Sequence, residues 1–273
     1  MLRLAAALAV LASTCTSGGA PITTEAQPGP VGTPVEIESV IDGDSVRVAA
    51  DGQSLNVRLL GINAPEQDEC WSEEATAALE QALAGRNNSI VGAEEDQYGR
   101  LLAYVYSGAT NVNYGLVLDG SAIAIAVDHE DLPDFLAAEE EAISLERGLW
   151  APTACGSSSD RFEVRIWAIE PDAPGRDDRN PNREWVAITN AGQLVDLSGW
   201  VLRDESSTHR YVFPDGFILA TGEIVTVRSG CGEDARPDLY WCADGTVWTN
   251  SGDTVLLLDG FGAVVDRMRY LDD

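Results

Sequence analysis

The chain has 273 residues, 45% of them hydrophobic, so it is long enough for two packed domains and too apolar to be disordered throughout. It carries 45 Asp and Glu residues against 17 basic residues, all of them Arg, for a formal net charge of −28. Such a charge repels phosphate backbones at long range and excludes binding of nucleic acid through a broadly basic surface. A nucleic-acid partner would need a local arginine cluster or a bound cation.

Residues 1–20 have the pattern of an export signal. One positive residue precedes an apolar run at 4–12, which is too short to span a bilayer as a mature helix. Two processing sites fit the sequence: cleavage after Ala20, or lipid attachment at Cys15. Residues 21–33 are rich in Pro, Gly and Thr and are expected to form a flexible tether. We therefore expect a secreted or cell-surface protein with no membrane span in its mature form, lipid-anchored if Cys15 is used.

The remaining four cysteines are expected to form disulfides, because export places them in an oxidising compartment. Four cysteines allow three pairings. Cys231 and Cys242 flank one loop, which favours their pairing with each other. Cys70 would then pair with Cys155 by elimination.

Residues 34–154 alternate five short strands with three helical patterns. Strand signals, which are apolar residues alternating between turn residues, occupy 35–40, 44–50, 54–62, 88–93 and 100–108. Helical patterns occupy 72–85, 112–120 and 131–150. We expect Ser72 and Asp131 to cap the first and third helices. Together these elements predict an α+β domain built on a small five-stranded barrel of the OB-fold type.

The segment "IDGDSV" (41–46) joins the first two strands and allows two interpretations. Asp-Gly is typical of a tight hairpin turn, because Gly43 tolerates the positive φ that such turns need. Alternatively, the hairpin also directs the Asp44 carboxylate at a metal ion. Asp44 alone does not distinguish the two, so the other motifs decide.

Residues 155–161 are rich in Ser and Gly and are expected to be a linker. Helical periodicity disappears after them, and residues 162–273 contain short strands separated by turn residues. The strand signals occupy 162–171, 184–190, 200–204, 210–214, 223–230 and 253–260. This spacing predicts an all-β domain, an antiparallel sandwich of the immunoglobulin type.

Three motifs in the first domain carry residues suited to phosphodiester hydrolysis. In chain order they are "IDGDSV" (41–46), "RLLGINAPE" (58–66) and "YGRLLAY" (98–104). This reaction needs an activated water and cations that offset charge on the phosphoryl oxygens. Arg58 and Arg100 are permanently charged, forked donors for phosphate, and Glu66 can act as a base. Asp44 offers the hard oxygen ligands that Ca²⁺ binds.

In this order and spacing, the three motifs resemble the thermonuclease family of staphylococcal-nuclease-like OB-fold phosphodiesterases. The resemblance covers about residues 34–150 and includes the final helix that ends in "GLW". It implies that Arg58, Glu66 and Arg100 are catalytic. The calcium ligands that it implies are the side chains of Asp44 and Asn63 and the carbonyl of Ala64, with Asp42 acting through a water.

Three features depart from the family pattern. Asn63 stands where the family usually has a second metal aspartate, so we expect weaker calcium binding. Gln97 replaces a lysine that can contact phosphate. Ala126 and Asp128 stand where the best-known members have the aromatic pair that stacks a base. We therefore expect weak base stacking and a modest, salt-sensitive affinity for substrate.

The second half resembles the lamin-tail domain, an immunoglobulin-like β-sandwich. The matching segments are "NREWVAITNAG" (182–192), "VDLSGWVLRD" (195–204), "YVFPDGFIL" (211–219) and "VWTNSGDTVLLLDGFGAVVD" (247–266). The expected core aromatics are Trp185, Trp200, Phe213 and Trp248, and the expected corner residues are Asp196, Gly199, Gly252 and Asp253. No catalytic set of residues converges there, so we expect a domain that binds DNA, a protein or a cell-surface polymer.

The sequence therefore predicts an exported, calcium-dependent nuclease that cleaves DNA, with RNA as a second substrate. One rival is a catalytically silent, nuclease-derived binding module of a surface protein, but Arg58, Glu66 and Arg100 are all present. A second rival is a surface anchor in which the lamin-tail domain is the main functional part. His129 and His209 have no partners at ligand spacing and are expected to be surface or loop residues, not bases or zinc ligands.

Overall fold

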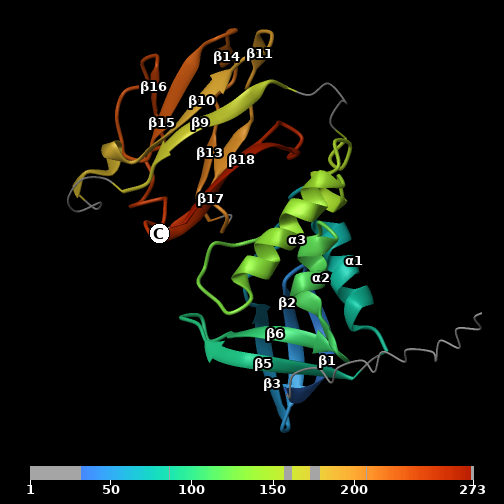
Figure 1. Ribbon diagram of the computed structural model, residues 1–273. Coiled ribbons are helices and arrows are strands. Elements are labelled where there is room, and N and C mark those ends of the chain that lie inside the picture. The colour runs from blue at the N-terminus through green and yellow to red at the C-terminus, as the bar shows by residue number, and fades with distance from the viewer. Residues whose placement is uncertain (1–31, 86, 157–161, 173–178, 207, 272–273) are drawn as a thin grey trace, which may run out of the picture.

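The computed structural model describes residues 32–85, 87–156, 162–172, 179–206 and 208–271, which form two domains in chain order (Figure 1). The expected signal segment, Cys15 and nearly all of the tether lie outside the described residues, as does most of the linker. Within the described residues, no helix is both long and apolar enough to cross a bilayer.

The first domain is a closed five-stranded barrel, as expected. Its sheet runs in the order β3-β2-β1-β5-β6, and a parallel pairing of β3 with β6 closes it. The strands are β1 (Thr33–Asp42), β2 (Ser45–Ala50), β3 (Gln53–Leu59), β5 (Asn88–Glu95) and β6 (Leu101–Ser107). The domain also has three two-residue strands. β4 (Ile62–Asn63) pairs with β8 (Ile123–Ala124), and β7 (Thr110–Asn111) pairs antiparallel with the end of β6.

Three helices lie between the barrel and the second domain (Figure 1). They are α1 (Ser72–Leu83), α2 (Val112–Leu118) and α3 (Leu132–Ser144), and a short 3₁₀ turn (Gly148–Trp150) follows α3. Their apolar sides contribute fully buried residues such as Leu79 and Phe135 to the core.

The expected cap of α1 was wrong, and Asp131 stands at the N-cap position of α3 without a side-chain capping bond. Trp71, in the left-handed region, precedes α1, so Ser72 is already the first helical residue and caps nothing. The Asp131 carboxylate accepts a hydrogen bond from the Asn111 side chain at 3.3 Å instead of capping α3. The one side-chain cap among the described α-helices belongs to α2, where Asn111 accepts from the backbone N–H of Tyr114.

Gly43 is required in the β1–β2 hairpin for a different reason from the one expected. It is absent from the described glycines with positive φ. A Cβ at this position would instead lie 2.6 Å from the Cβ of Ala64 and 2.7 Å from that of Ala75. The glycine therefore lets the hairpin approach α1 and the loop after β4.

The second domain is a sandwich of two four-stranded sheets, ordered β16-β15-β10-β9 and β13-β12-β17-β18, with a small β11–β14 pair. The first sheet contains β9 (Val164–Glu170), β10 (Trp185–Asn190), β15 (Ile224–Arg228) and β16 (Asp238–Tyr240). The second contains β12 (Val201–Arg203), β13 (Arg210–Val212), β17 (Gly252–Leu258) and β18 (Val264–Leu271). The small pair is β11 (Val195–Asp196) with β14 (Ile218–Leu219), and a 3₁₀ turn (Pro181–Arg183) precedes β10.

Most of the expected sandwich is confirmed, with three differences. Trp200, Phe213 and Trp248 are buried in its core, but Trp185 is only half-buried. The β15–β16 pair is parallel, so the sandwich is not wholly antiparallel. The strand β18 was not expected, because its arginines interrupt the apolar pattern; Arg269 pairs instead with the first domain, as described below.

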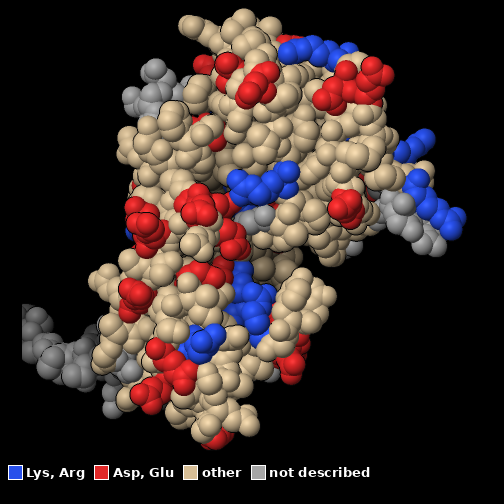
Figure 2. All heavy atoms as spheres, turned by 180° about the vertical axis from the view of Figure 1, so that it is seen from behind, with Lys and Arg blue, Asp and Glu red and all other residues tan. Residues whose placement is uncertain are grey.

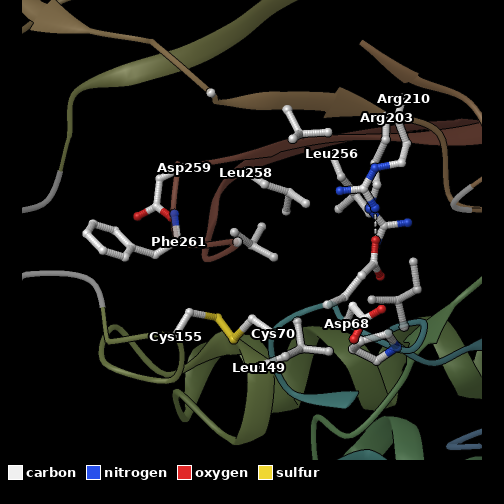
Figure 3. A pocket seen from close by; sticks show the side chains of 18 of the residues that line it. Asp68, Cys70, Leu149, Cys155, Arg203, Arg210, Leu256, Leu258, Asp259 and Phe261 are labelled. Carbon is white, nitrogen blue, oxygen red and sulfur yellow. Dashed lines mark hydrogen bonds and ion pairs between the residues drawn. A yellow bond between two sulfur atoms is a disulfide. The ribbon is translucent and has the colours of Figure 1, made fainter. Parts of the chain in front are cut away.

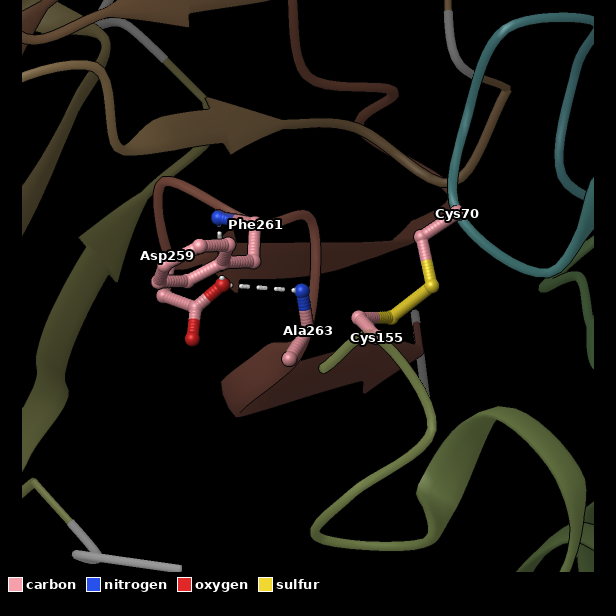
Figure 4. The surroundings of a disulfide bond; sticks show 5 residues. All are labelled: Cys70, Cys155, Asp259, Phe261 and Ala263. Atoms are coloured by element: carbon pink, nitrogen blue, oxygen red, sulfur yellow. Dashed lines mark hydrogen bonds between the residues drawn. A yellow bond between two sulfur atoms is a disulfide. The ribbon is translucent and has the colours of Figure 1, made fainter. Parts of the chain in front are cut away.

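Both expected disulfides are confirmed, Cys70–Cys155 and Cys231–Cys242. The first ties the loop before α1 to the end of the nuclease-like domain, with the two Cα atoms 5.6 Å apart. Figure 4 shows that it lies beside the turn at Asp259–Ala263 of the second domain. A Cβ on Gly262 would lie 3.1 Å from the Cys70 Cβ, so the two domains touch closely here.

Candidate active site

Asp44 and Arg58 form the centre of the candidate site. Ser45 pairs with Arg58 across β2 and β3, so the sheet register places the hairpin turn beside the arginine. Arg58 Nη2 lies 2.9 Å from Asp44 Oδ2 and donates to Asn63 Oδ1 at 2.8 Å. Nη1 donates to two backbone carbonyls of the β3–β4 connection. Four oxygen atoms therefore fix one guanidinium group.

The Asp44 carboxylate is buried and fully engaged. Oδ2 accepts the backbone N–H of Ala64 at 2.7 Å, and Oδ1 accepts the Ser45 hydroxyl at 2.9 Å. Burial raises the pKa of Asp44 to about 6, although the Arg58 guanidinium acts in the opposite direction by stabilising the charged form. Asp42 Oδ1 accepts the backbone N–H of Asp44 at 3.1 Å, so Asp42 braces the turn directly.

The oxygen atoms expected to bind a cation are occupied by Arg58 in this structure. Asp44 Oδ2 and Asn63 Oδ1 both lie within 2.9 Å of Arg58 Nη2, so a calcium ion could bind both only after this guanidinium moves away. Ca²⁺ takes six to eight such oxygens, and the rest would come from water and phosphate. Among the described residues, no three His, Cys, Asp or Glu side chains are arranged to hold a metal. Ala64, whose carbonyl was expected to bind calcium, contacts Asp44 through its backbone N–H group.

The fold brings Arg58, Asn63, Glu66 and Arg100 to one cleft of about 470 Å³. Arg58 lies opposite Leu102 in the parallel β3–β6 pair, which explains why Arg100, just before β6, reaches the same cleft. Glu66 is exposed on the loop after β4. In the view from behind, the surface is hollowed between the two lobes, with acidic and basic side chains at the rim (Figure 2).

Two local contacts position Arg100 and Glu66. Arg100 Nε donates to Asp96 Oδ2 at 2.9 Å across the turn before β6. The backbone N–H of Glu66 donates to Glu69 Oε2 at 2.9 Å, and Glu69 N–H donates back to the Glu66 carbonyl. This closed turn holds the Glu66 side chain toward solvent in the cleft.

The opposite wall of the cleft comes from the second domain, which sequence reasoning missed. Its charged lining residues are Asp204, Glu205, His209 and Asp253. Glu205 Oε1 accepts the backbone N–H of Ala126 at 2.7 Å, across the domain boundary. The position where the family places a base-stacking aromatic is therefore small, buried and covered by the second domain.

Both histidines lie in loops, as expected, but each has a side-chain partner. His209 Nδ1 lies 2.8 Å from Asp204 Oδ2, and the imidazole lines the cleft. His129 is half-buried, with Nδ1 2.7 Å from the Tyr104 hydroxyl and its ring 5.0 Å from that of Phe135. Burial lowers the pKa of His129. The Asp-x₄-His spacing was a weak sequence signal for the His209 pair.

A second cavity, of about 300 Å³, lies beside the cleft between the two domains. Asn63 borders both. Figure 3 shows Arg203 and Arg210 at one end, Phe261 at the other and the Cys70–Cys155 disulfide along one side. At the arginine end, Arg210 forms an ion pair with Glu69. Burial lowers the pKa of Arg203 to about 10, and the nearby carboxylates of Asp204 and Glu66 act in the opposite direction.

Comparison with known proteins agrees with both domains. Residues 56–152 match the family model described as staphylococcal nuclease homologue, and residues 157–272 match the lamin tail domain. An Escherichia coli O157:H7 protein named "Uncharacterized endonuclease" is 31% identical over 129 residues, which are 47% of this chain and 80% of the relative. The chain belongs to the staphylococcal nuclease family and carries a lamin-tail domain.

Two other relatives cover much of the same region. "Protein ParB" of Escherichia coli is 31% identical over 188 residues, 65% of this chain and 95% of the relative. "Thermonuclease" of Staphylococcus hyicus is 29% identical over 122 residues, 41% of this chain and 72% of the relative. The nuclease-family character of the first domain is therefore shared with proteins from distant bacteria.

Proposed function

We propose that this protein is an exported, calcium-dependent nuclease that hydrolyses phosphodiester bonds of DNA, and of RNA as a second substrate. One observation carries the proposal: two arginines, one exposed glutamate and Asn63 line a single cleft of a nuclease-family domain, and Asp44 pairs with one of these arginines. Relatives named endonuclease and thermonuclease support the same reaction class.

The chain's own residues would act as follows. Glu66 would take a proton from the attacking water, which suits a carboxylate that is exposed at the cleft. Arg58 and Arg100 would donate to the non-bridging phosphate oxygens and stabilise charge as the bond to the leaving oxygen breaks. The two terminal nitrogens of Arg58 already bond four acceptors, so Arg58 would have to exchange some of these partners for phosphate oxygens, whereas Arg100 is oriented by Asp96.

Asp44 and Asn63 would hold the calcium ion, with Ala64 as the third protein ligand. When bound, the ion supplies positive charge to the phosphate and orients water. With one carboxylate and one amide, we expect low affinity, since calcium affinity rises with the number of charged ligands.

Export is supported by the disulfides, which persist in oxidising compartments. The apolar segment at 4–12 would be the export signal, with Cys15 as an alternative lipid site. The lamin-tail domain would bind a cell-surface component or DNA. Its exposed apolar side chains include Trp167 on β9, at 65% exposure.

The test is cleavage of single-stranded DNA by the full chain, with calcium or with a chelator, by wild type and Glu66→Gln. We expect calcium-dependent cleavage that the substitution lowers by about 10²- to 10⁴-fold, as loss of a positioned base does. Glu80→Gln, an exposed change of the same kind on α1, is the control and should keep full activity. No cleavage at any calcium concentration would refute the nuclease proposal; normal cleavage by Glu66→Gln would refute only the role of Glu66.

A further inference from the structure

The two domains share an apolar core. Ile123 and Leu149 of the nuclease domain pack with Val201, Leu256 and Leu258 of the lamin-tail domain, and all five are less than a tenth exposed. Burial of several such side chains removes apolar surface from water and so stabilises the docked arrangement. The lamin-tail domain is therefore held in a fixed position on the nuclease domain.

The two faces of strand β17 pack into two different hydrophobic cores. Val255 and Leu257 point into the sandwich, whereas Leu256 and Leu258 belong to the cluster between the domains. Successive side chains of a strand point to opposite faces, so this run serves both. Substitution of Leu256 or Leu258 can therefore disturb the docking while leaving the sandwich core intact.

Polar contacts fix the orientation of the docked domain. Arg269 Nη1 on β18 lies 2.8 Å from Glu139 Oε2 of α3, and Arg269 Nη2 donates to the Ala124 carbonyl at 2.7 Å. Glu139 is fully buried, so its charge depends on such partners. The Glu205 bond to Ala126 lies at the neighbouring edge of the interface.

This orientation places the turn after β12 over the cleft that contains Arg58, Glu66 and Arg100. The two walls differ in charge. The nuclease wall carries Arg58, Arg100 and Glu66, whereas the described part of the lamin-tail wall carries buried carboxyl groups and His209 but no arginine. The guanidinium donors for phosphate are therefore on one wall.

We propose that the lamin-tail domain is the second wall of the catalytic cleft and, through its docked position, limits the width of the cleft and so selects single-stranded over double-stranded nucleic acid. This inference rests on the nuclease function proposed above. A cleft of about 470 Å³ has the size of a small-molecule pocket and suits a short piece of one strand. A single nucleic-acid strand can direct its phosphates toward Arg58 and Arg100 while its bases point away from these arginines.

A duplex meets both walls. It carries one negative charge per about 1.7 Å of axis, distributed over two strands. When one strand reaches the arginines, the second strand meets the turn after β12 on the opposite wall, whose described residues offer it no arginine. The docked domain also blocks the approach of a wide, stiff helix, and the shared core opposes its displacement.

The experiment compares two circular substrates of the same sequence, a single strand and a relaxed, covalently closed duplex, neither of which has ends that fray. The full-length wild type should cleave the single strand at least about tenfold faster. In Leu256→Glu/Leu258→Glu, the new carboxylates would be buried without partners if the domains stayed docked, so docking is lost. This variant should cleave duplex faster and lower the ratio at least about fivefold, while its radius of gyration in solution rises.

Ile224→Glu is the matched control, because Ile224 is 43% exposed on β15 of the other sheet. It should leave the ratio unchanged. If the double variant fails to fold, Arg269→Ala takes its place, since it removes the contacts with Glu139 and Ala124 without adding a buried charge. A wild type that cleaves both circles equally, or a ratio that the undocking variants leave unchanged, overturns the inference. Absence of cleavage of either circle by every protein refutes the nuclease proposal itself.

Discussion

Both domains bury carboxylates, but they give them different partners. In the nuclease domain, Asp44 faces a guanidinium at the floor of a cleft. In the lamin-tail domain, Glu184 accepts the backbone N–H groups of Val247 and Trp248. Asp259 accepts those of residues 261 and 263 in the same way, as Figure 4 shows. The first arrangement leaves charge available for chemistry, whereas the second satisfies backbone donors in loops.

The comparison teaches that burial of a carboxylate does not by itself identify a functional site. What distinguishes Asp44 is that, besides the backbone N–H of Ala64, it contacts the side chains of Arg58 and Ser45, which can exchange partners when a ligand arrives. Bonds to backbone amides change only when the loop itself moves. Substitutions in each domain can separate carboxylates used for chemistry from those used for structure, and substitutions of the disulfides compare what stabilises each domain.

Removal of the two disulfides should affect the two domains unequally. Cys70–Cys155 joins residues 85 apart, and Cys231–Cys242 joins residues 11 apart. Because stabilisation grows with the loop that is closed, Cys70→Ser/Cys155→Ser should lower the free energy of unfolding by about 4–5 kcal/mol, and Cys231→Ser/Cys242→Ser by about 3 kcal/mol. Denaturant midpoints measure both. A larger loss in the second pair would show that loop size does not govern stability here.

Neutralising one carboxylate in each domain should separate chemistry from structure. Asp44→Asn removes the negative partner of Arg58 and a calcium ligand of the proposed site, so kcat/KM on single-stranded DNA should fall about a hundredfold. Glu184→Gln should leave kcat/KM of the folded protein unchanged but lower the free energy of unfolding by about 1–3 kcal/mol. Steady-state kinetics and thermal unfolding of both variants measure this. Full activity in Asp44→Asn would refute the proposed centre.

Much of the fold was accessible from local patterns. Alternating apolar residues predicted the five barrel strands, because each strand has one face in the core. The cysteine spacing gave the disulfide pairing. The three motifs likewise predicted that Arg58, Glu66 and Arg100 share one cleft. These features depend on short segments or on a register that short segments define.

The parts that were missed depend on how the domains dock. Asp204 and Glu205 come from a turn whose place over the cleft is set by the shared core, which no local pattern encodes. One signal was present: the run "VLLL" (255–258) is apolar at every position, whereas a sandwich strand with one solvent face should alternate. The Gly43 prediction failed similarly, because the space it leaves is needed by Ala64 and Ala75, which lie far along the chain.

Glu205 sharpens the comparison further, because it is a buried carboxyl group at the boundary of the two domains. Burial, together with the charge of Asp253, raises its pKa to about 8, against an ordinary value of 4.5. Both the folded and the unfolded state are protonated below pH 4.5. Between pH 4.5 and 8 the folded state keeps a proton that the unfolded state releases, so this group makes stability fall as pH rises through that window.

Glu205→Gln removes this titration and keeps an oxygen that can accept the Ala126 N–H. Relative to wild type, the variant should therefore gain stability progressively between pH 5 and 8, by about 4 kcal/mol at pH 8. Denaturant unfolding at a series of pH values measures the difference, and Glu233→Gln, an exposed change in the same domain, should show none. A difference that does not change with pH would mean that Glu205 is charged in the folded protein. The lamin-tail wall would then carry its full negative charge at neutral pH.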